Sequence, residues 1–267
     1  MPEPTLCLGH RGHRCPAWPE PENSLAAFDR ALACGCDGLE LDLRHTADGR
    51  IVIHHDDALH FRGTAIEVGA NRLGSLQRMQ PHLASLAQVL SRYRNTAWLD
   101  LEIKTMEAAR LLPPLLERYP PRRGFVVSCF DPEVLHHLAM AAPQAPCCLN
   151  LKRPCSLRRI RAAGVEWVAP HQASCTGWYV GWLRAHGWKV LVWTVNHPAR
   201  MRLLAKAGAD AICSDLPDLL VRTLARSSTT DARATHPPLA ASFPEHEQPR
   251  GRHPAAGGEL RRVVSKP

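Results

Sequence analysis

Eight short apolar segments alternate with amphipathic segments along the first 225 residues, and this alternation restricts the fold more than any other feature of the chain. Short apolar runs between polar segments are typical of buried strands, and the segments between them have a helical pattern. Three of the helix-like segments stop at a glycine, the usual residue just past a helix end. The strand-like runs are 5–8, 38–43, 97–103, 125–129, 146–149, 167–168, 190–195 and 211–213.

This order of elements predicts an α/β protein with a (β/α)8 TIM barrel. The main alternative is an open doubly wound sheet, which is less favoured because no Gly-x-Gly-x-x-Gly motif follows the first strand. The irregular region 57–90 predicts a short insertion after the second strand. We expect a single barrel domain over residues 1–225. Residues 226–267, rich in Pro, Ala, Ser, Thr and His, predict a disordered tail.

Composition excludes several classes of protein. A hydrophobic content of 45% and a charged content of 22% are ordinary for a globular chain. No apolar run approaches the roughly 18 residues that span a bilayer, and the N-terminus lacks the pattern of a signal peptide, so we expect a cytoplasmic protein without stable membrane insertion. The net charge of +8 is spread thinly along the sequence, and a nucleic-acid partner is not expected.

Charged side chains fall where the predicted barrel strands end, which is where TIM-barrel enzymes carry their active sites. Glu40 and Asp42 are two apart in one strand, so they point to the same side, as do Glu102 and Lys104 in the next. Oxygens from Glu40, Asp42 and Glu102 would form part of a site for Mg²⁺ or Ca²⁺. The alternative is a structural ion network of these acids with nearby basic side chains.

Two histidines are candidates for acid–base catalysis. His10 ends the first strand, and His55 ends the apolar run 51–53 together with His54, near the expected rim of the barrel. His13 and His54 are the competing candidates.

Taken in order, the motifs of residues 5–220 resemble those of the glycerophosphodiester phosphodiesterase family. The resemblance rests on Gly9-His10-Arg11-Gly12, Pro21-Glu22-Asn23-Ser24, Gly38-Leu39-Glu40-Leu41-Asp42, Val52-Ile53-His54-His55-Asp56, Leu101-Glu102-Ile103-Lys104, Trp193-Thr194-Val195-Asn196 and Ser214-Asp215-Leu216-Pro217. Ser24 stands where the family more often has Thr, and the insertion at about 63–83 is short, which leaves the alcohol specificity open.

The resemblance implies a TIM-barrel phosphoric diester hydrolase that uses a divalent cation, with Mg²⁺, Ca²⁺ and Mn²⁺ as candidates. Substrates would be glycerophosphodiesters such as glycerophosphocholine or glycerophosphoethanolamine, and the products sn-glycerol 3-phosphate and an alcohol. By the same resemblance the metal ligands would be Glu40, Asp42 and Glu102, the acid and base His10 and His55, the phosphate contacts Arg11 and Lys104, and the pocket wall Trp193.

Other functions stay open on the sequence alone. The same barrel could carry a lysophospholipase D-like or sphingolipid phosphodiesterase activity. Lys104 could instead form a Schiff base in a barrel lyase, and a decayed barrel could bind a ligand without catalysis. We expect a monomer or a homodimer.

Overall fold

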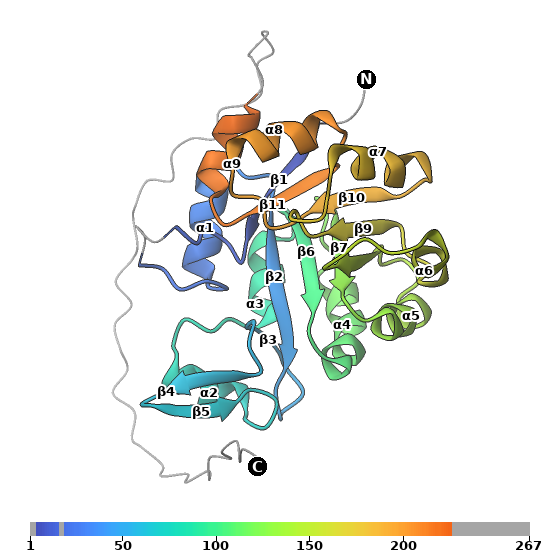
Figure 1. The fold of residues 1–267 in the computed structure, drawn as a ribbon. Helices are drawn as coiled ribbons and strands as arrows, with labels where there is room; N and C mark the ends of the chain where they lie inside the picture. Colours follow the sequence, from blue (N-terminus) through green and yellow to red (C-terminus); the bar gives the residue numbers. More distant parts are fainter. Residues whose placement is uncertain (1–3, 16–18, 226–267) are drawn as a thin grey trace, which may run out of the picture.

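Eight parallel strands close into a barrel in the computed structural model, which describes residues 4–15 and 19–225 (Figure 1). The barrel closes because β1 pairs with both β11 and β2. The predicted TIM barrel is therefore confirmed. In chain order the barrel strands are β1 (Leu6–His10), β2 (Gly38–His45), β6 (Trp98–Ile103), β7 (Phe125–Cys129), β8 (Cys147–Leu151), β9 (Trp167–Pro170), β10 (Lys189–Val192) and β11 (Ala211–Ser214).

Helices cover the outside of the barrel, with one between each pair of successive barrel strands and one after the last. Their apolar faces bury the main core against the outer side of the strands, and a second cluster fills the barrel interior. The outer helices are α1 (Leu25–Ala33), α3 (Leu86–Tyr93), α4 (Met106–Arg118), α5 (Pro132–Ala141), α6 (Leu157–Ala162), α7 (Gly177–Ala185), α8 (Pro198–Lys206) and α9 (Pro217–Leu224).

Three of these helices, α3, α4 and α9, were not among the helix-like segments of the sequence. Helix α3 has a capping box, in which Ser85 and Gln88 each accept a hydrogen bond from the other's backbone N–H. Helix α4 contains Pro113 and Pro114, which ordinarily break a helix. It continues through them because its apolar face, which includes Leu112 and Leu116, is buried against the barrel.

The expected insertion after β2 consists of a short strand, a hairpin and a helix. Strand β3 (Ile51–Ile53) pairs antiparallel with the end of β2, and β4 (Ala58–Phe61) forms a hairpin with β5 (Thr64–Glu67) before α2 (Leu73–Met79). The insertion has its own apolar cluster. It lies on the side of the barrel toward which β2 and β6 point, so it borders the end that carries active sites in this fold (Figure 1).

The predicted tail, residues 226–267, lies outside the described residues, so the tail and the boundary at residue 225 stay predictions. Within the described ranges, no helix combines the length and the apolar character that crossing a bilayer requires. The ten cysteines are all free thiols.

Gly38 begins β2 at a place where the backbone of β6 approaches it closely. A Cβ at position 38 would lie 2.1 Å from the carbonyl oxygen of Trp98. We predict that Gly38→Ala lowers the free energy of unfolding by about 1–3 kcal/mol, because neighbouring strands must separate. Urea denaturation followed by circular dichroism measures this loss.

Gly181→Ala is the matched control. Gly181 is exposed in α7, and a Cβ there meets no heavy atom of the described chain within 4 Å. Alanine is the better helix former, so this variant should be unchanged or more stable by about 0.5–1 kcal/mol. Equal stability of Gly38→Ala and the unmodified protein would contradict the close approach.

Candidate active site

Three carboxylates meet at the carboxyl end of β2 and β6. These strands pair in parallel with Asp42 opposite Glu102, so the side chains of Glu40, Asp42 and Glu102 enter the barrel mouth together. One oxygen from each lies within 4.8 Å of the other two. The carboxylate group predicted from the sequence is therefore assembled in the structure.

Basic side chains are interleaved with these carboxylates. Lys104 Nζ lies 2.8 Å from Asp42 Oδ1 and also contacts Glu102. Arg11 Nε is 3.0 Å from Asp42 Oδ2, and the Asn23 amide donates to the same oxygen at 2.7 Å. Asp42 is thus neutralised from both sides, and it fixes the positions of the predicted phosphate contacts Arg11 and Lys104.

The carboxylates differ in acidity because these cations are unevenly distributed. Burial alone would raise the pKa of Asp42, but Lys104 and Arg11 outweigh it and hold that pKa below its usual value. Burial raises the pKa of Glu40 well above its usual value, and the neighbouring Asp42 and Glu102 raise it further. Burial also raises the pKa of Glu102, although Lys104 opposes this.

Lys104 stays an ammonium in this environment. Burial would lower its pKa, but Asp42 and Glu102 outweigh burial and raise that pKa above the usual value. A lysine that forms a Schiff base must lose its proton to act as a nucleophile. The site therefore disfavours the lyase alternative.

The donor set fits a divalent cation. Glu40 Oε1 is buried and receives no hydrogen bond from any described residue. Three carboxylates against the charges of Lys104 and Arg11 leave the cluster with a formal charge of −1. Mg²⁺ and Ca²⁺ prefer carboxylate oxygens, and such an ion would satisfy the unpartnered oxygen and relieve the repulsion that raises the pKa of Glu40.

Arg11 also depends on a backbone conformation that the Gly-His-Arg-Gly motif allows. Its φ of 54° directs its N–H to Glu40 Oε2 at 2.9 Å. The next residue, Gly12, has a φ of 86°, and a Cβ there would lie 2.7 Å from the Ala27 backbone. The motif therefore turns the chain tightly over α1 and places Arg11 against the carboxylates.

His10 is oriented by a carboxylate that follows the neighbouring strand β11, with which β1 pairs. Its Nδ1 lies 2.7 Å from Asp215 Oδ1, and its Nε2 faces Glu40 Oε2 at 3.8 Å. Asp215 also accepts hydrogen bonds from Arg14 and Asn196. Burial would raise the pKa of Asp215, but its bonds to His10 and Asn196 and the charge of Arg14 lower it strongly. An ionised Asp215 assigns the Nδ1 proton to His10 and leaves Nε2 toward the cluster.

His55 is more open than His10. Its side chain is 38% exposed, and its Nδ1 lies 2.7 Å from Asp56 Oδ1. Arg44 holds the loop through a hydrogen bond from its Nε to the His55 carbonyl at 2.7 Å. Within the described chain no hydrogen bond or ion pair joins His55 to the carboxylate group. The hydrogen bond with His55 lowers the pKa of Asp56, and the charge of Arg11 lowers it slightly further, so the His55–Asp56 pair lies within electrostatic range of the mouth.

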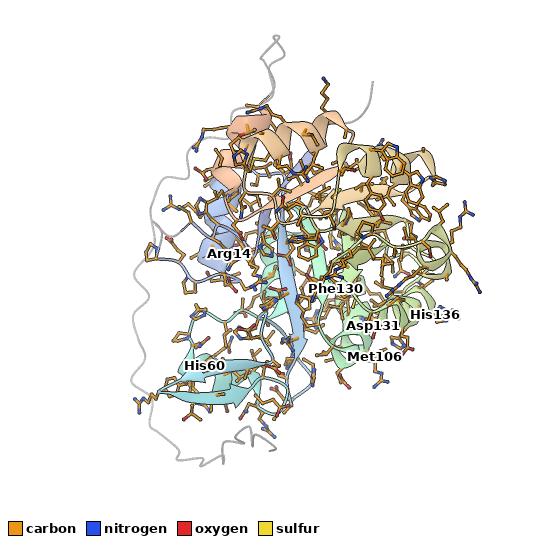
Figure 2. The ribbon with its side chains drawn as sticks, viewed as in Figure 1. Arg14, His60, Met106, Phe130, Asp131 and His136 are labelled. Carbon is orange, nitrogen blue, oxygen red and sulfur yellow. The ribbon has the colours of Figure 1, made fainter. Side chains whose placement is uncertain are left out.

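Trp193 follows β10 and lies in an aromatic group rather than against the carboxylates. Its ring meets those of Phe130 at 5.5 Å and His171 at 4.8 Å, and its indole N–H donates to the Ala169 carbonyl. Lys152 Nζ lies 5.5 Å above the Phe130 ring. Figure 2 shows Phe130 on the α4–α5 side of the barrel, across from Arg14 on the α1 side.

Asp100 lies below the three carboxylates, opposite Glu40 in the sheet. It is buried, and it accepts a hydrogen bond of 2.6 Å from the Ser128 hydroxyl. Burial raises the pKa of Asp100 to about 7, although the Ser128 hydrogen bond opposes this and Glu102 adds to it.

A model of the glycerophosphoryl diester phosphodiesterase family matches residues 10–106 and 106–219. The chain belongs to this family. A glycerophosphodiester phosphodiesterase of Caldanaerobacter subterraneus subsp. tengcongensis is 27% identical over 242 residues, which are 81% of this chain and 96% of that protein.

Solved structures give the same fold. A putative glycerophosphoryl diester phosphodiesterase from Silicibacter pomeroyi has a TM-score of 0.75 at 24% identity, covering 84% of this chain and 94% of that one. A phosphodiesterase from Oleispira antarctica, solved in complex with the product sn-glycerol-3-phosphate, has a TM-score of 0.72 at 24% identity, covering 83% and 97%. The family model thus confirms the predicted family, and these structures confirm its fold.

Several residues that shape this family member's site received no role from the sequence. Asn23 binds Asp42, and its φ of 57° explains why its motif favours asparagine, which tolerates this conformation. Glu22 accepts from Arg11 and pairs with Arg14. The Pro-Glu-Asn-Ser motif contributed to the family resemblance, but its contact with β2 depends on the fold and does not follow from the motif itself.

Asp100 gives the metal-free protein a predictable pH dependence. An unfolded Asp has a pKa near 3.9, so between about pH 4 and 7 the folded state binds the proton more tightly. The contribution of Asp100 to stability is therefore lost as pH rises through this range. We predict that Asp100→Asn gains at least about 1 kcal/mol relative to the unmodified protein between pH 5 and pH 8.

Urea unfolding in EDTA at the two pH values measures this difference. A stability difference between the two proteins that is the same at pH 5 and pH 8 would contradict a raised pKa for Asp100.

Proposed function

We propose that the protein hydrolyses glycerophosphodiesters, such as glycerophosphocholine and glycerophosphoethanolamine, to sn-glycerol 3-phosphate and an alcohol, with a divalent cation held by Glu40, Asp42 and Glu102. The observation that carries the proposal is the carboxylate cluster with its unpartnered Glu40 oxygen, beside an oriented histidine and two cations. The product named for the Oleispira antarctica phosphodiesterase supports the choice of substrate.

Proton transfer would fall to His10 and His55. A phosphodiester has a poor leaving group at neutral pH, so one group must protonate the departing alkoxide while another activates the nucleophile. Each histidine has a carboxylate on Nδ1, Asp215 for His10 and Asp56 for His55, which leaves Nε2 free to exchange a proton. Asp215 and Asp56 are positioning residues in this scheme.

Charge on the phosphoryl oxygens would be met by Arg11 and Lys104. Both are held in place by Asp42, so they need little reorganisation as negative charge develops. A bound divalent cation supplies Lewis-acid stabilisation of the same oxygens. The cluster charge of −1 would become +1 with the ion bound, which attracts an anionic diester. Trp193 would form part of the pocket wall.

His10→Ala and His55→Ala should each lower kcat/KM for glycerophosphocholine by about 100- to 10,000-fold, because each removes one proton-transfer group. Release of sn-glycerol 3-phosphate by the full-length protein, with Mg²⁺, Ca²⁺ or Mn²⁺ restored after EDTA, is the measurement. A lysophospholipid assayed in parallel tests the lysophospholipase D-like alternative.

His136→Ala is the control, since His136 is exposed on α5, away from the mouth (Figure 2). It should retain normal turnover. Near-normal activity of both mouth variants would remove His10 and His55 from the mechanism.

Glu40→Gln should weaken cation binding by about tenfold or more, because affinity for a hard cation depends on the charge of its oxygen ligands. The readout is the rise in melting temperature on adding Mn²⁺ or Ca²⁺ to EDTA-treated protein, which requires no turnover. Glu22→Gln removes a carboxylate that lies beside Arg11 but outside the cluster, so it should keep the cation response. An equal response in Glu40→Gln and the unmodified protein would place the cation elsewhere.

A further inference from the structure

Aromatic rings form a ladder along the outer face of α7. Trp178 is 73% exposed, and its ring stacks on Trp182 with centroids 6.1 Å apart and an interplanar angle of 25°. The Trp182 ring in turn lies 4.7 Å from that of His186. Residues four apart share a helix face, so the three rings form one continuous strip. Such a strip of indoles toward solvent is unusual for a surface without a partner.

The positive charge of the barrel is concentrated beside this strip. Residues 152–189 contain seven Lys and Arg and one acidic residue, a net charge of +6. The whole chain carries +8, of which residues 226–267 carry +3, so residues 1–225 carry +5. The rest of the barrel sequence therefore has a net charge of −1. The sequence as a whole indicates a thinly spread positive charge. Within residues 1–225, however, the net positive charge lies in α6, α7 and their flanking segments.

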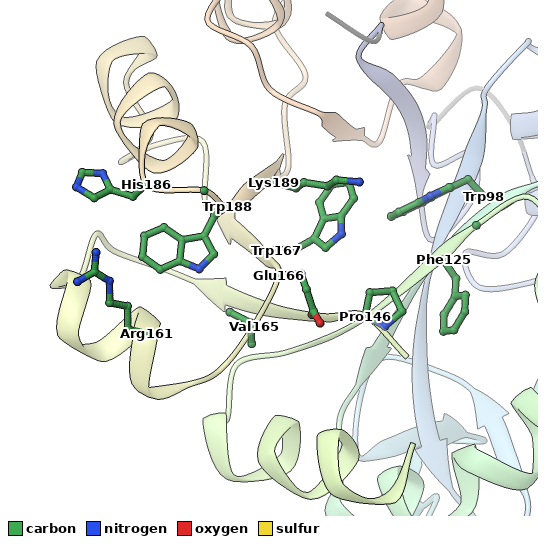
Figure 3. Close-up of a pocket in the computed structure, with 12 residues that line it drawn as sticks. Trp98, Phe125, Pro146, Arg161, Val165, Glu166, Trp167, His186, Trp188 and Lys189 are labelled. Atoms are coloured by element: carbon green, nitrogen blue, oxygen red, sulfur yellow. The ribbon is translucent and has the colours of Figure 1, made fainter. Parts of the chain in front are cut away.

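The end of α6 and the residue that follows α7 line one cleft, so side chains of the two helices meet on one side of the barrel. A cleft of about 710 Å³ at the amino ends of β6, β7, β9 and β10 is lined by Arg161 of α6 and by His186, which follows α7. Figure 3 shows these two side chains on either side of Trp188. We call this group the α6–α7 surface: the exposed Arg158, Arg159, Arg161, Trp178 and His186, and the partly buried Trp182, which packs against the main core.

We propose that the α6–α7 surface binds peripherally to a lipid bilayer that contains anionic phospholipids. Indole rings favour the interface between headgroups and acyl chains, where their apolar body is buried and their N–H stays hydrated. Exposed arginines are attracted to the negative surface of such a bilayer. The three arginines of α6 make no ion pair with a described residue that would compete for their charge. Aromatic rings and basic side chains on one face are the chemistry of an interfacial anchor.

Two other occupants fit the surface less well. In a twofold dimer the same patch meets itself, and two surfaces with this excess of arginine would repel each other. Single-stranded nucleic acid binds by stacking its bases on the open faces of aromatic rings. Here Trp178 stacks on Trp182, and Trp182 also stacks on Tyr179, so few ring faces are left for a base.

This inference goes beyond the proposed hydrolysis and does not depend on it. Binding to a bilayer is measured without turnover, so it can fail while the enzyme is active, or succeed in an inactive protein.

The test is co-sedimentation of the full-length protein with vesicles of phosphatidylcholine alone and of phosphatidylcholine with phosphatidylglycerol at a ratio of about 7:3. We expect binding to the anionic vesicles only, weakening as salt is added. Arg158→Gln with Arg161→Gln should weaken partitioning by about 30-fold. Trp178→Ser with Trp182→Ser should weaken it by about tenfold or more, and Trp178→Phe with Trp182→Phe should retain most of it.

Arg62→Gln with Arg78→Gln removes the same charge from the insertion, across the barrel from α6 and α7 (Figure 1). This control should bind as the unmodified protein does, and it separates the surface from a general effect of net charge. Absence of binding at every salt concentration, or equal binding by all variants, would overturn the proposal. So would a dimer that the tryptophan variant converts to monomer, or tighter binding to an oligouridylate that the same variants abolish.

Discussion

The repulsion among three carboxylates at the barrel mouth is the constraint around which the rest of the site is arranged. Glu40, Asp42 and Glu102 are brought together by the register of β2 against β6. Without compensation, charges this close in a buried place would oppose folding. Lys104 and Arg11 provide that compensation for Asp42 and Glu102. At Glu40, burial and the remaining repulsion raise the pKa of the carboxyl group. The acidities of the three carboxylates follow from this one arrangement, as do the proposed phosphate contacts and the proposed cation site.

The barrel could be predicted from the sequence because its evidence is local. Each strand is a short apolar run, and several helices end at a glycine, so neither depends on distant contacts. Helices α3, α4 and α9 were not predicted, and in α4 packing overrides a local rule. Helix α4 tolerates Pro113 and Pro114 because its buried leucines hold it in place. The position of the insertion was expected, but its strands and helix are held by a small apolar core of their own, which the hydrophobic pattern does not predict.

The site was predictable to the extent that strand position and residue type suffice. Carboxylates two apart in one strand must share a face, and the parallel neighbour then supplies Glu102. Contacts between residues that are distant in the sequence do not follow from spacing. His10 meets Asp215 from the far end of the chain, with Arg14 and Asn196 around it, and Asn23 reaches Asp42 only because of an unusual backbone angle. Such partners depend on loops whose course the fold decides.

Lys104 bridges Asp42 and Glu102 as an internal counter-ion, and this has a consequence for how the fold would depend on the proposed divalent cation. An internal counter-ion lets the mouth assemble fully before a divalent ion arrives. The fold would then not depend on metal, in contrast to small zinc domains that unfold without it. On the proposed mechanism, a cell short of the cation would keep a stable reserve of inactive but intact molecules. These molecules could regain activity when the cation is supplied again, without new protein synthesis.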